Sequence, residues 1–399
     1  MTSTACAIAQ WAHDVEPTPD DFALADRALA DTVAVTLAAR DHPVTALAAT
    51  LGEGGRWAAA GHVLDFDDLH MPSTTHISAV CVPTALAAGG DARAYLAAAG
   101  VMARLGTELG WGHYSAGWHA TCTAGAPASA AGAAVAMGLD VPGIATAIAL
   151  AVPAAGGVQR AFGTDAKSLQ VGFAVDAGLR AALLAANGAS ADDTALDDWL
   201  HLVRAKPGGL DLTGPAIPDG LAIKMYPCCY ALQRPISAVA DLASRAGLDA
   251  GDVRRIELRT MEATVVPLIH HRPETGLQGK FSLEYGIAAA LLDRYPGFAS
   301  FTDAAVRRDL ARALGGLIET RLDPGGDWLL DGEFKVKIHT GSGAVERAVL
   351  RYPPGSPATP PSPEQLSAKL ADCVSGLATD PATWTWQSAA DVLREYLPR

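Results

Sequence analysis

Runs of lysine and arginine are absent from this sequence of 399 residues, although 30 such residues are spread along it. Asp and Glu together number 43, so the formal net charge is −13. A protein that binds nucleic acid needs a concentrated basic surface to neutralise phosphates. The composition therefore excludes nucleic acid as an expected partner. Because the protein is acidic overall, any anionic ligand would have to bind at a local group of positively charged side chains.

Cysteine is scarce as well, with six residues and no CxxC spacing. The one close pair, Cys228 and Cys229, is adjacent, which suits neither a zinc knuckle nor an ordinary disulfide framework. The same spacing offers no set of thiolates for an iron–sulfur cluster. The N-terminus lacks a basic segment and becomes polar from His13 onward, so no signal peptide is expected. We therefore expect a reduced, cytoplasmic protein.

Aromatic residues make up only 6% of the chain, whereas half of the residues are hydrophobic and 40 are glycine. Such a composition excludes a disordered chain. Small residues at this density favour closely packed helices over a β-sandwich. The longest apolar stretch, residues 127–158, is interrupted by Asp140, Pro142 and Pro153. We therefore expect buried helices there and no membrane span.

The N-terminal half of the chain follows the helical period. Asp20 begins one helical segment, further Ala-rich segments begin at Pro83 and Asp91, and residues 165–187 form one long amphipathic helix. Alternation with a period of two first appears beyond the Gly- and Pro-rich loop of residues 207–220. In that part we predict strands at residues 255–259, 334–339 and 345–352, and helices at residues 235–246 and 283–293.

Ser362 and Pro363 are typical of a helix N-cap followed by proline at the first helical position. The whole pattern predicts a mainly α protein with an inserted α+β domain. We expect a helical domain over residues 1–220 and a smaller α+β domain over residues 221–355. The C-terminal helices, residues 356–399, are expected to return to the helical domain.

The densest group of chemistry-bearing residues lies between residues 64 and 76, which hold three aspartates and two histidines. If this segment is helical, Asp65 and Asp68 share a face. Acid–base chemistry is favoured, because imidazole changes its charge near neutral pH; helix capping is the simpler alternative. A metal site is the weaker alternative, because the segment contains neither HExxH nor H-x-H.

Further polar residues lie in four other segments. His119 is surrounded by small and hydroxyl residues, and Lys167 begins a helix whose free N–H groups would also attract an anion. For these residues the simpler alternatives are a hydrogen-bonded structural histidine and a solvated lysine. Residues 224–235 and 279–285 carry the remaining candidates, Lys224, Tyr226, Cys229, Arg234 and Lys280. Together the cations would form a local pocket for a small polycarboxylate.

These segments resemble the MmgE/PrpD family, which includes 2-methylcitrate dehydratase, cis-aconitate decarboxylase and iminodisuccinate epimerase. The resemblance is carried in family order by LDFDDLH, TTHISAV, GWHATCTAG, FGTDAKSLQVG, KMYPCCYALQRPI and GKFSLEYGIAAALLD. It implies a helical domain with an inserted α+β lid and an active site between the two. It also implies catalysis without a metal or another cofactor, and a homodimer.

The resemblance implies catalytic roles for Asp65, His76, His119, Lys167 and Lys224. For contacts with the substrate we add Asp68, Tyr226, Cys229, Arg234 and Lys280. Two positions depart from the family pattern. Leu69 stands where a threonine often follows DFDD, and Cys229 and Gln233 lie where the lid commonly has a histidine.

The reactions of this family form or protonate a carbanion next to a carboxylate, so cations must stabilise the developing negative charge. We expect Lys167, Lys224 and His119 to do so. Asp65 and His76 would act as the acid–base pair, with their individual roles left open. The expected function is a metal-free hydro-lyase acting on a small di- or tricarboxylate. The alternatives are a decarboxylase or an isomerase on the same scaffold, and a noncatalytic carboxylate-binding protein.

Overall fold

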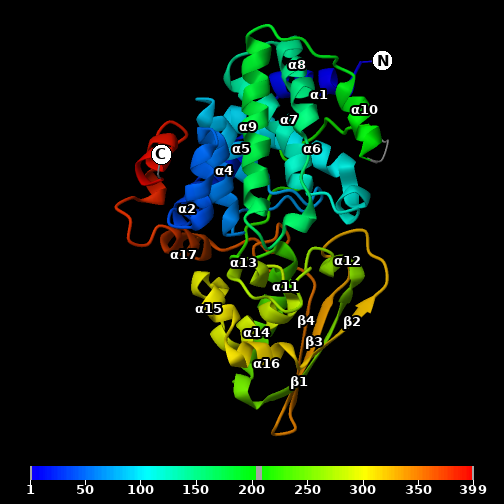
Figure 1. Cartoon of the computed structure of the whole chain (residues 1–399), viewed down its shortest axis with the longest axis vertical. Helices are drawn as coiled ribbons and strands as arrows, with labels where there is room; N and C mark the ends of the chain where they lie inside the picture. Colours follow the sequence, from blue (N-terminus) through cyan, green and yellow to red (C-terminus); the bar gives the residue numbers. More distant parts are fainter. Residues whose placement is uncertain (1, 204–208, 398–399) are drawn as a thin grey trace. The chain divides into compact units, whose positions relative to one another are not determined.

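The computed structural model describes residues 2–203 and 209–397 (Figure 1). The chain divides into two compact units. The helical unit comprises residues 1–160, 165–222 and 362–399, and the α+β unit comprises residues 161–164 and 223–361. The prediction of a mainly α protein with a smaller α+β part is confirmed. Residues 207 and 208 of the predicted loop lie outside the described residues.

The helical unit is organised around α7 (Ala120–Ala136), which packs against α5, α6, α8 and α9. Small side chains permit this close packing. A Cβ at Gly132 would lie 2.5 Å from the Cβ of Ala98 on α6, so only glycine fits there. The other helices of this unit are α1 (Thr4–Asp14), α2 (Pro19–Ala38), α3 (Pro43–Leu47), α4 (Glu53–Val63), α5 (Ile77–Ala87), α6 (Ala92–Ser115), α8 (Val141–Ala151), α9 (Ala166–Ala186), α10 (Ala195–Leu202), α17 (Pro363–Cys373) and α18 (Ala389–Tyr396).

Helix α9 is, within the described residues, the helix that is long and apolar enough to cross a membrane. The core helix of a soluble protein meets the same criteria of length and composition, and α9 packs against α4, α7 and α8. Its other side exposes Phe173, Leu183 and Leu184, each by about half. We refer to these three residues as the exposed α9 face.

Residues 64–76, which we call the site loop, connect α4 to α5 and contain no regular helix. The helical face considered for Asp65 and Asp68 therefore does not exist. Asp65 has a φ of 54°, in the left-handed region, which costs a residue with a Cβ about 1–2 kcal/mol. The expectation that a helix begins at Pro83 is also wrong. Pro83 lies inside α5, because the side chain of Asp68 accepts a hydrogen bond from Ser78 N and so caps the true start.

The α+β unit has a four-stranded sheet in the order β2-β1-β3-β4. Strand β1 pairs in parallel with β2 and antiparallel with β3, and β3 pairs antiparallel with β4. The bounds are β1 (Val253–Met261), β2 (Ile318–Asp323), β3 (Phe334–Thr340) and β4 (Val345–Leu350). The helices are α11 (Tyr230–Arg245), α12 (Glu262–Val265), α13 (Gly276–Gly279), α14 (Leu283–Asp293), α15 (Asp303–Val306) and α16 (Asp309–Gly315).

The alternation predicted from the sequence is visible in this sheet. Ile256, Val336 and Ile338 are buried in one apolar core, whereas the other face is charged and includes an ion pair between Arg255 and Glu319. Helix α11 packs against β3, β4 and α14 (Figure 1). It begins at Tyr230, five residues before the predicted start, and Pro235 lies inside it.

Candidate active site

Four of the predicted residues come together in the helical unit. Asp65 and His76 lie in the site loop, His119 is the N-cap of α7, and Lys167 lies in the first turn of α9. All four are buried. A residue that was not predicted, His62 in the last turn of α4, connects them. Its ring lies 4.7 Å from that of His76 and 5.7 Å from that of His119, measured between centroids.

His62 makes one hydrogen bond through each ring nitrogen. Its Nδ1 lies 2.7 Å from Asp67 Oδ2, and the ammonium of Lys167 lies 2.6 Å from Nε2. An ammonium can only donate, so Nε2 accepts and Nδ1 carries the hydrogen that is donated to Asp67. Burial, and the nearby Lys167, lower the pKa of His62 to about 4 although Asp67 opposes the shift. His62 is therefore neutral at pH 7 and orients Lys167.

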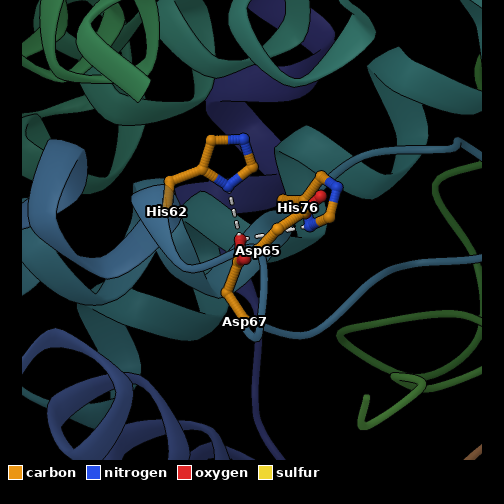
Figure 2. Close-up of side chains that lie close together, drawn as sticks. All are labelled: His62, Asp65, Asp67 and His76. Carbon is orange, nitrogen blue, oxygen red and sulfur yellow. Dashed lines mark hydrogen bonds and ion pairs between the residues drawn. The ribbon is translucent and has the colours of Figure 1, made fainter. Parts of the chain in front are cut away.

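Asp67 also contacts His76, and Figure 2 shows the two imidazoles approaching this one carboxylate. The distance from His76 Nδ1 to Asp67 Oδ2 is 3.1 Å, and the backbone oxygen of Asp68 lies 2.8 Å from the same nitrogen. Both partners are acceptors, so Nδ1 of His76 carries a hydrogen. In the neutral ring the lone pair is then on Nε2. An imidazole oriented in this way by a carboxylate is suited to act as a base.

Asp65 forms an ion pair with Lys167, whose Nζ lies 3.3 Å from Asp65 Oδ1. The side chains are 2% and 6% exposed, respectively, so water screens the pair little. Removal of one partner from such a pair typically costs about 3–5 kcal/mol. The positive charge of Lys167 is thus held by one carboxylate and one neutral imidazole.

His119 is oriented by Gln170 on α9. The side-chain oxygen of Gln170 accepts a hydrogen bond from Val158 N at 3.0 Å, which fixes the orientation of the amide. The amide nitrogen then donates to His119 Nδ1 at 2.8 Å. Burial lowers the pKa of His119 well below its usual value, and Lys167 adds to the shift. His119 is therefore a neutral imidazole with its hydrogen on Nε2, where it can act as a hydrogen-bond donor.

Asp68 has a different environment from that of Asp65 and Asp67. It is fully buried, and its Oδ1 accepts the hydrogen bond from Ser78 N at 3.1 Å. Burial raises the pKa of Asp68 to about 7, and the neighbouring Asp31 contributes to the shift. The structure thus places Asp68 at the start of α5, where it supports the loop that holds His76.

The ligand atoms of His62, Asp65, Asp67 and His76 all lie within 4.8 Å of one another. Two imidazoles and two carboxylates are of the kind that binds Zn²⁺ or Mn²⁺, so this set could hold a metal ion by distance alone. The ammonium of Lys167 already contacts two of the four residues. This side chain therefore supplies one positive charge to the cluster.

The remaining predicted residues belong to the α+β unit, and all are buried. Lys224 is fully buried just before α11. Arg234 is also fully buried, and its guanidinium donates to the backbone oxygens of Leu330, Gly332 and Arg351. These contacts connect α11 to the segments that flank β3 and β4, and a role for Arg234 in substrate binding stays a prediction.

Tyr226, Cys229 and Lys280 are likewise engaged within the α+β unit. The hydroxyl of Tyr226 lies 3.4 Å from Ser237 Oγ, and Cys229 is the N-cap of α11. Lys280 donates to the backbone oxygen of Pro227 and lies 4.9 Å from the centre of the Phe301 ring. Roles for these residues in substrate binding remain predictions.

Reasoning from the sequence missed His62, Asp67 and Gln170. Asp67 belongs to the same DFDD segment as Asp65 and Asp68, and His62 precedes it by five residues. The density of carboxylates and imidazoles was the available signal for these two residues. Gln170 gave no such signal, because its importance depends on the position of His119.

Comparisons with known proteins find matches in both halves of the chain. The MmgE/PrpD N-terminal domain matches residues 56–200, and the MmgE/PrpD C-terminal domain matches residues 226–394. Cis-aconitate decarboxylase from Aspergillus terreus is 26% identical over 332 residues, and so is the protein of that name from strain NIH 2624 / FGSC A1156. Each match covers 71% of this chain and 66% of the relative, just under two thirds of its length. The chain therefore belongs to the MmgE/PrpD family.

Proposed function

We propose that this protein is a hydro-lyase that removes water from a small di- or tricarboxylate through a carbanion with enolate-like charge. One observation carries the proposal: His76 is oriented by Asp67 beside the buried cation Lys167. A base and a cation are the two groups that proton removal next to a carboxylate requires. Family membership supports a reaction of this type.

In this mechanism, His76 Nε2 takes the proton from the carbon next to a substrate carboxylate. Asp67 keeps the imidazole in the required tautomer and stabilises the imidazolium that forms, as a carboxylate does in other Asp–His pairs. The imidazolium then returns its proton to the departing hydroxide. The C–H and C–O bonds break, a C=C bond forms, and water leaves.

Lys167 and His119 would stabilise the negative charge that develops on the substrate carboxylate. Lys167 supplies a full positive charge, and His119 supplies the hydrogen on Nε2. Asp65 and His62 hold the lysine, so its charge does not have to be reorganised during the reaction. For Lys224 we propose a contact with a substrate carboxylate, on the strength of the family motif alone.

Decarboxylation is the second candidate, and the name of the Aspergillus relatives favours it. Loss of CO2 leaves the same type of carbanion, so Lys167 would serve both reactions. The carbanion would then take a proton from an acid, and His76 in its protonated form could supply one. Epimerisation would need proton removal and return at the same carbon. The products distinguish the three reactions.

A proton NMR time course in D2O tests the proposal. Chelator-treated protein, with its metal content measured, is incubated with 2-methylcitrate, citrate, cis-aconitate or iminodisuccinate. Water loss with one of them would support the hydro-lyase, whereas loss of CO2 or deuterium entry without net reaction would support the alternatives. Ligand-induced stabilisation without turnover in all cases would favour a noncatalytic binding protein. The His76→Asn variant serves as the control for proton transfer.

A further inference from the structure

A lysine near the C-terminus reaches the backbone of the site loop. Lys369 lies on α17, which packs beside α2 (Figure 1). Its Nζ lies 2.7 Å from Asp31 Oδ1 on α2 and donates to the backbone oxygen of Phe66 at 2.9 Å. The same nitrogen lies 4.1 Å from the centre of the Phe66 ring. The side chains of Lys369 and Asp31 are 1% and 0% exposed.

The position of Phe66 gives this contact its importance. Phe66 lies between Asp65, which holds Lys167, and Asp67, which holds His62 and His76. Asp65 itself has the left-handed φ of 54°. A strained backbone of this kind persists only when the surrounding structure holds it in place. The ammonium of Lys369 reaches the loop from a helix 303 residues further along the chain.

Burial of a lysine ammonium is costly unless the charge is paired and its hydrogens are bonded. Lys369 meets these conditions with one carboxylate, one backbone oxygen and one aromatic ring. If Lys369 served only to neutralise Asp31, the ion pair between the two side chains would be sufficient. The other two are made to the residue that joins the two carboxylates of the candidate site.

We propose that Lys369 is a positioning residue for the active site. It fixes the backbone at Phe66, and this sets the directions in which Asp65 and Asp67 point. The inference rests on the proposed function for its effect on catalysis, but its effect on the site loop is independent of the reaction. Lys369 would act through Phe66 and would not touch the substrate.

The experiment compares Lys369→Met, Asp31→Asn and the double variant with the unmodified chain. The double variant removes both buried charges, so it avoids the uncompensated charge that each single change leaves. Arg394→Met is the matched control: Arg394 also connects the C-terminal segment to α4, through Glu53, but its described contacts lie outside the site loop. Hydrogen exchange of residues 64–76, unfolding in urea, and kcat and KM are measured for each.

In Lys369→Met we expect amide exchange in the site loop to accelerate about tenfold or more, the effect of losing one hydrogen bond to a charged group. Useful reporters are the amides of Leu69 and His70, which are bonded to Ala222 and Thr75. We expect kcat to fall about tenfold while KM changes less than about threefold. The double variant should regain most of the lost stability but keep the fast exchange and the low kcat. Arg394→Met should leave exchange in the loop unchanged.

Recovery of loop protection and kcat in the double variant would overturn the proposal, because Lys369 would then serve only to neutralise Asp31. Unchanged loop exchange in both variants that lack Lys369 would overturn it as well. If Lys369→Met does not fold, loop exchange and kcat of the double variant are sufficient to test the proposal. If the unmodified protein turns over none of the tested carboxylates, the proposed function is in question, while hydrogen exchange still tests the positioning role.

Discussion

The ammonium of Lys167 donates a hydrogen bond to His62 Nε2 at 2.6 Å, and both side chains are buried. This bond continues through His62 Nδ1 to Asp67 and from there to His76. The proposed cation and the proposed base are thus connected through one imidazole and one carboxylate. Changes in either connecting residue should affect catalysis even if the residue never touches the substrate.

Replacement of His62 tests this connection. We expect His62→Ala to lower kcat/KM about tenfold to a hundredfold, because Lys167 loses one of its two described partners. His62→Gln, which retains an acceptor, should lose less. Lys167→Met should lose about a hundredfold to a thousandfold, as expected when a group that stabilises developing charge is removed. Steady-state kinetics measure all three, and equal activity of His62→Ala and the unmodified protein would contradict the assignment.

Asp67→Asn tests which aspartate supports the base. The asparagine side chain is neutral, so it accepts hydrogen bonds from His62 and His76 more weakly and does not stabilise an imidazolium. We therefore expect proton abstraction to slow about a hundredfold or more. The measurement is deuterium entry at the carbon next to the carboxylate, followed by NMR. Asp65→Asn should act through Lys167, because loss of the ion pair would displace the cation that stabilises the negative charge on the substrate. A large loss for Asp65→Asn with none for Asp67→Asn would favour the pairing first expected from the sequence.

Asp68 should make the stability of the fold depend on pH. The ordinary pKa of its carboxyl is 3.8, and burial raises the folded-state pKa to about 7. Between these values the folded state keeps a proton that the unfolded state has released, so this group favours folding less as the pH rises from about 4 to about 7. Above about pH 8, where the carboxyl is ionised in both states, its contribution no longer changes.

The neutral variant Asp68→Asn should lack this dependence, since its amide does not titrate. We expect the free energy of unfolding of Asp68→Asn, relative to that of the unmodified protein, to rise between pH 5 and pH 8. Urea unfolding at several pH values measures the difference, in which contributions from other titratable groups cancel. A difference that stays constant across this range would show that Asp68 is ionised throughout.

The exposed α9 face should form part of a homodimer interface, the assembly that the family resemblance implies. Phe173, Leu183 and Leu184 are each about half exposed, and covering them would contribute about 1 kcal/mol per side chain. We expect Phe173→Glu and Leu184→Glu to shift the protein to monomers in sedimentation velocity. Leu322→Glu, at an exposed position of β2, is the control. Dimers that persist in both α9 variants would place the interface elsewhere.

Elements whose signals are local were predicted well from the sequence. Helix α14 spans Leu283–Asp293, as predicted, and Ser282 caps it by accepting from Tyr285 N. Ser362 begins α17 with a capping box and a proline at the first helical position. The alternating pattern also located β3 and β4. Capping and alternation depend on neighbouring residues, so the sequence is sufficient to reveal them.

Elements whose ends depend on distant partners were predicted less well. Strand β2 was missed because its residues are mostly exposed and its pairing with β1 is parallel and nonlocal. Helix α5 begins before Pro83 because a carboxylate from the site loop caps it. The sequence contains these residues but not the distances between them.

The candidate site likewise has features that the sequence reveals and features that depend on contacts between distant residues. The sequence by itself determined the family, the mainly α class and the residue types of the cluster, since motifs and composition are properties of the chain. Only the tertiary structure decided that Asp67 supports His76, that His62 holds Lys167, and that Lys369 reaches Phe66. Hydrogen bonds and ion pairs depend on separations of a few ångströms, and folding sets these separations between residues that are far apart in the chain.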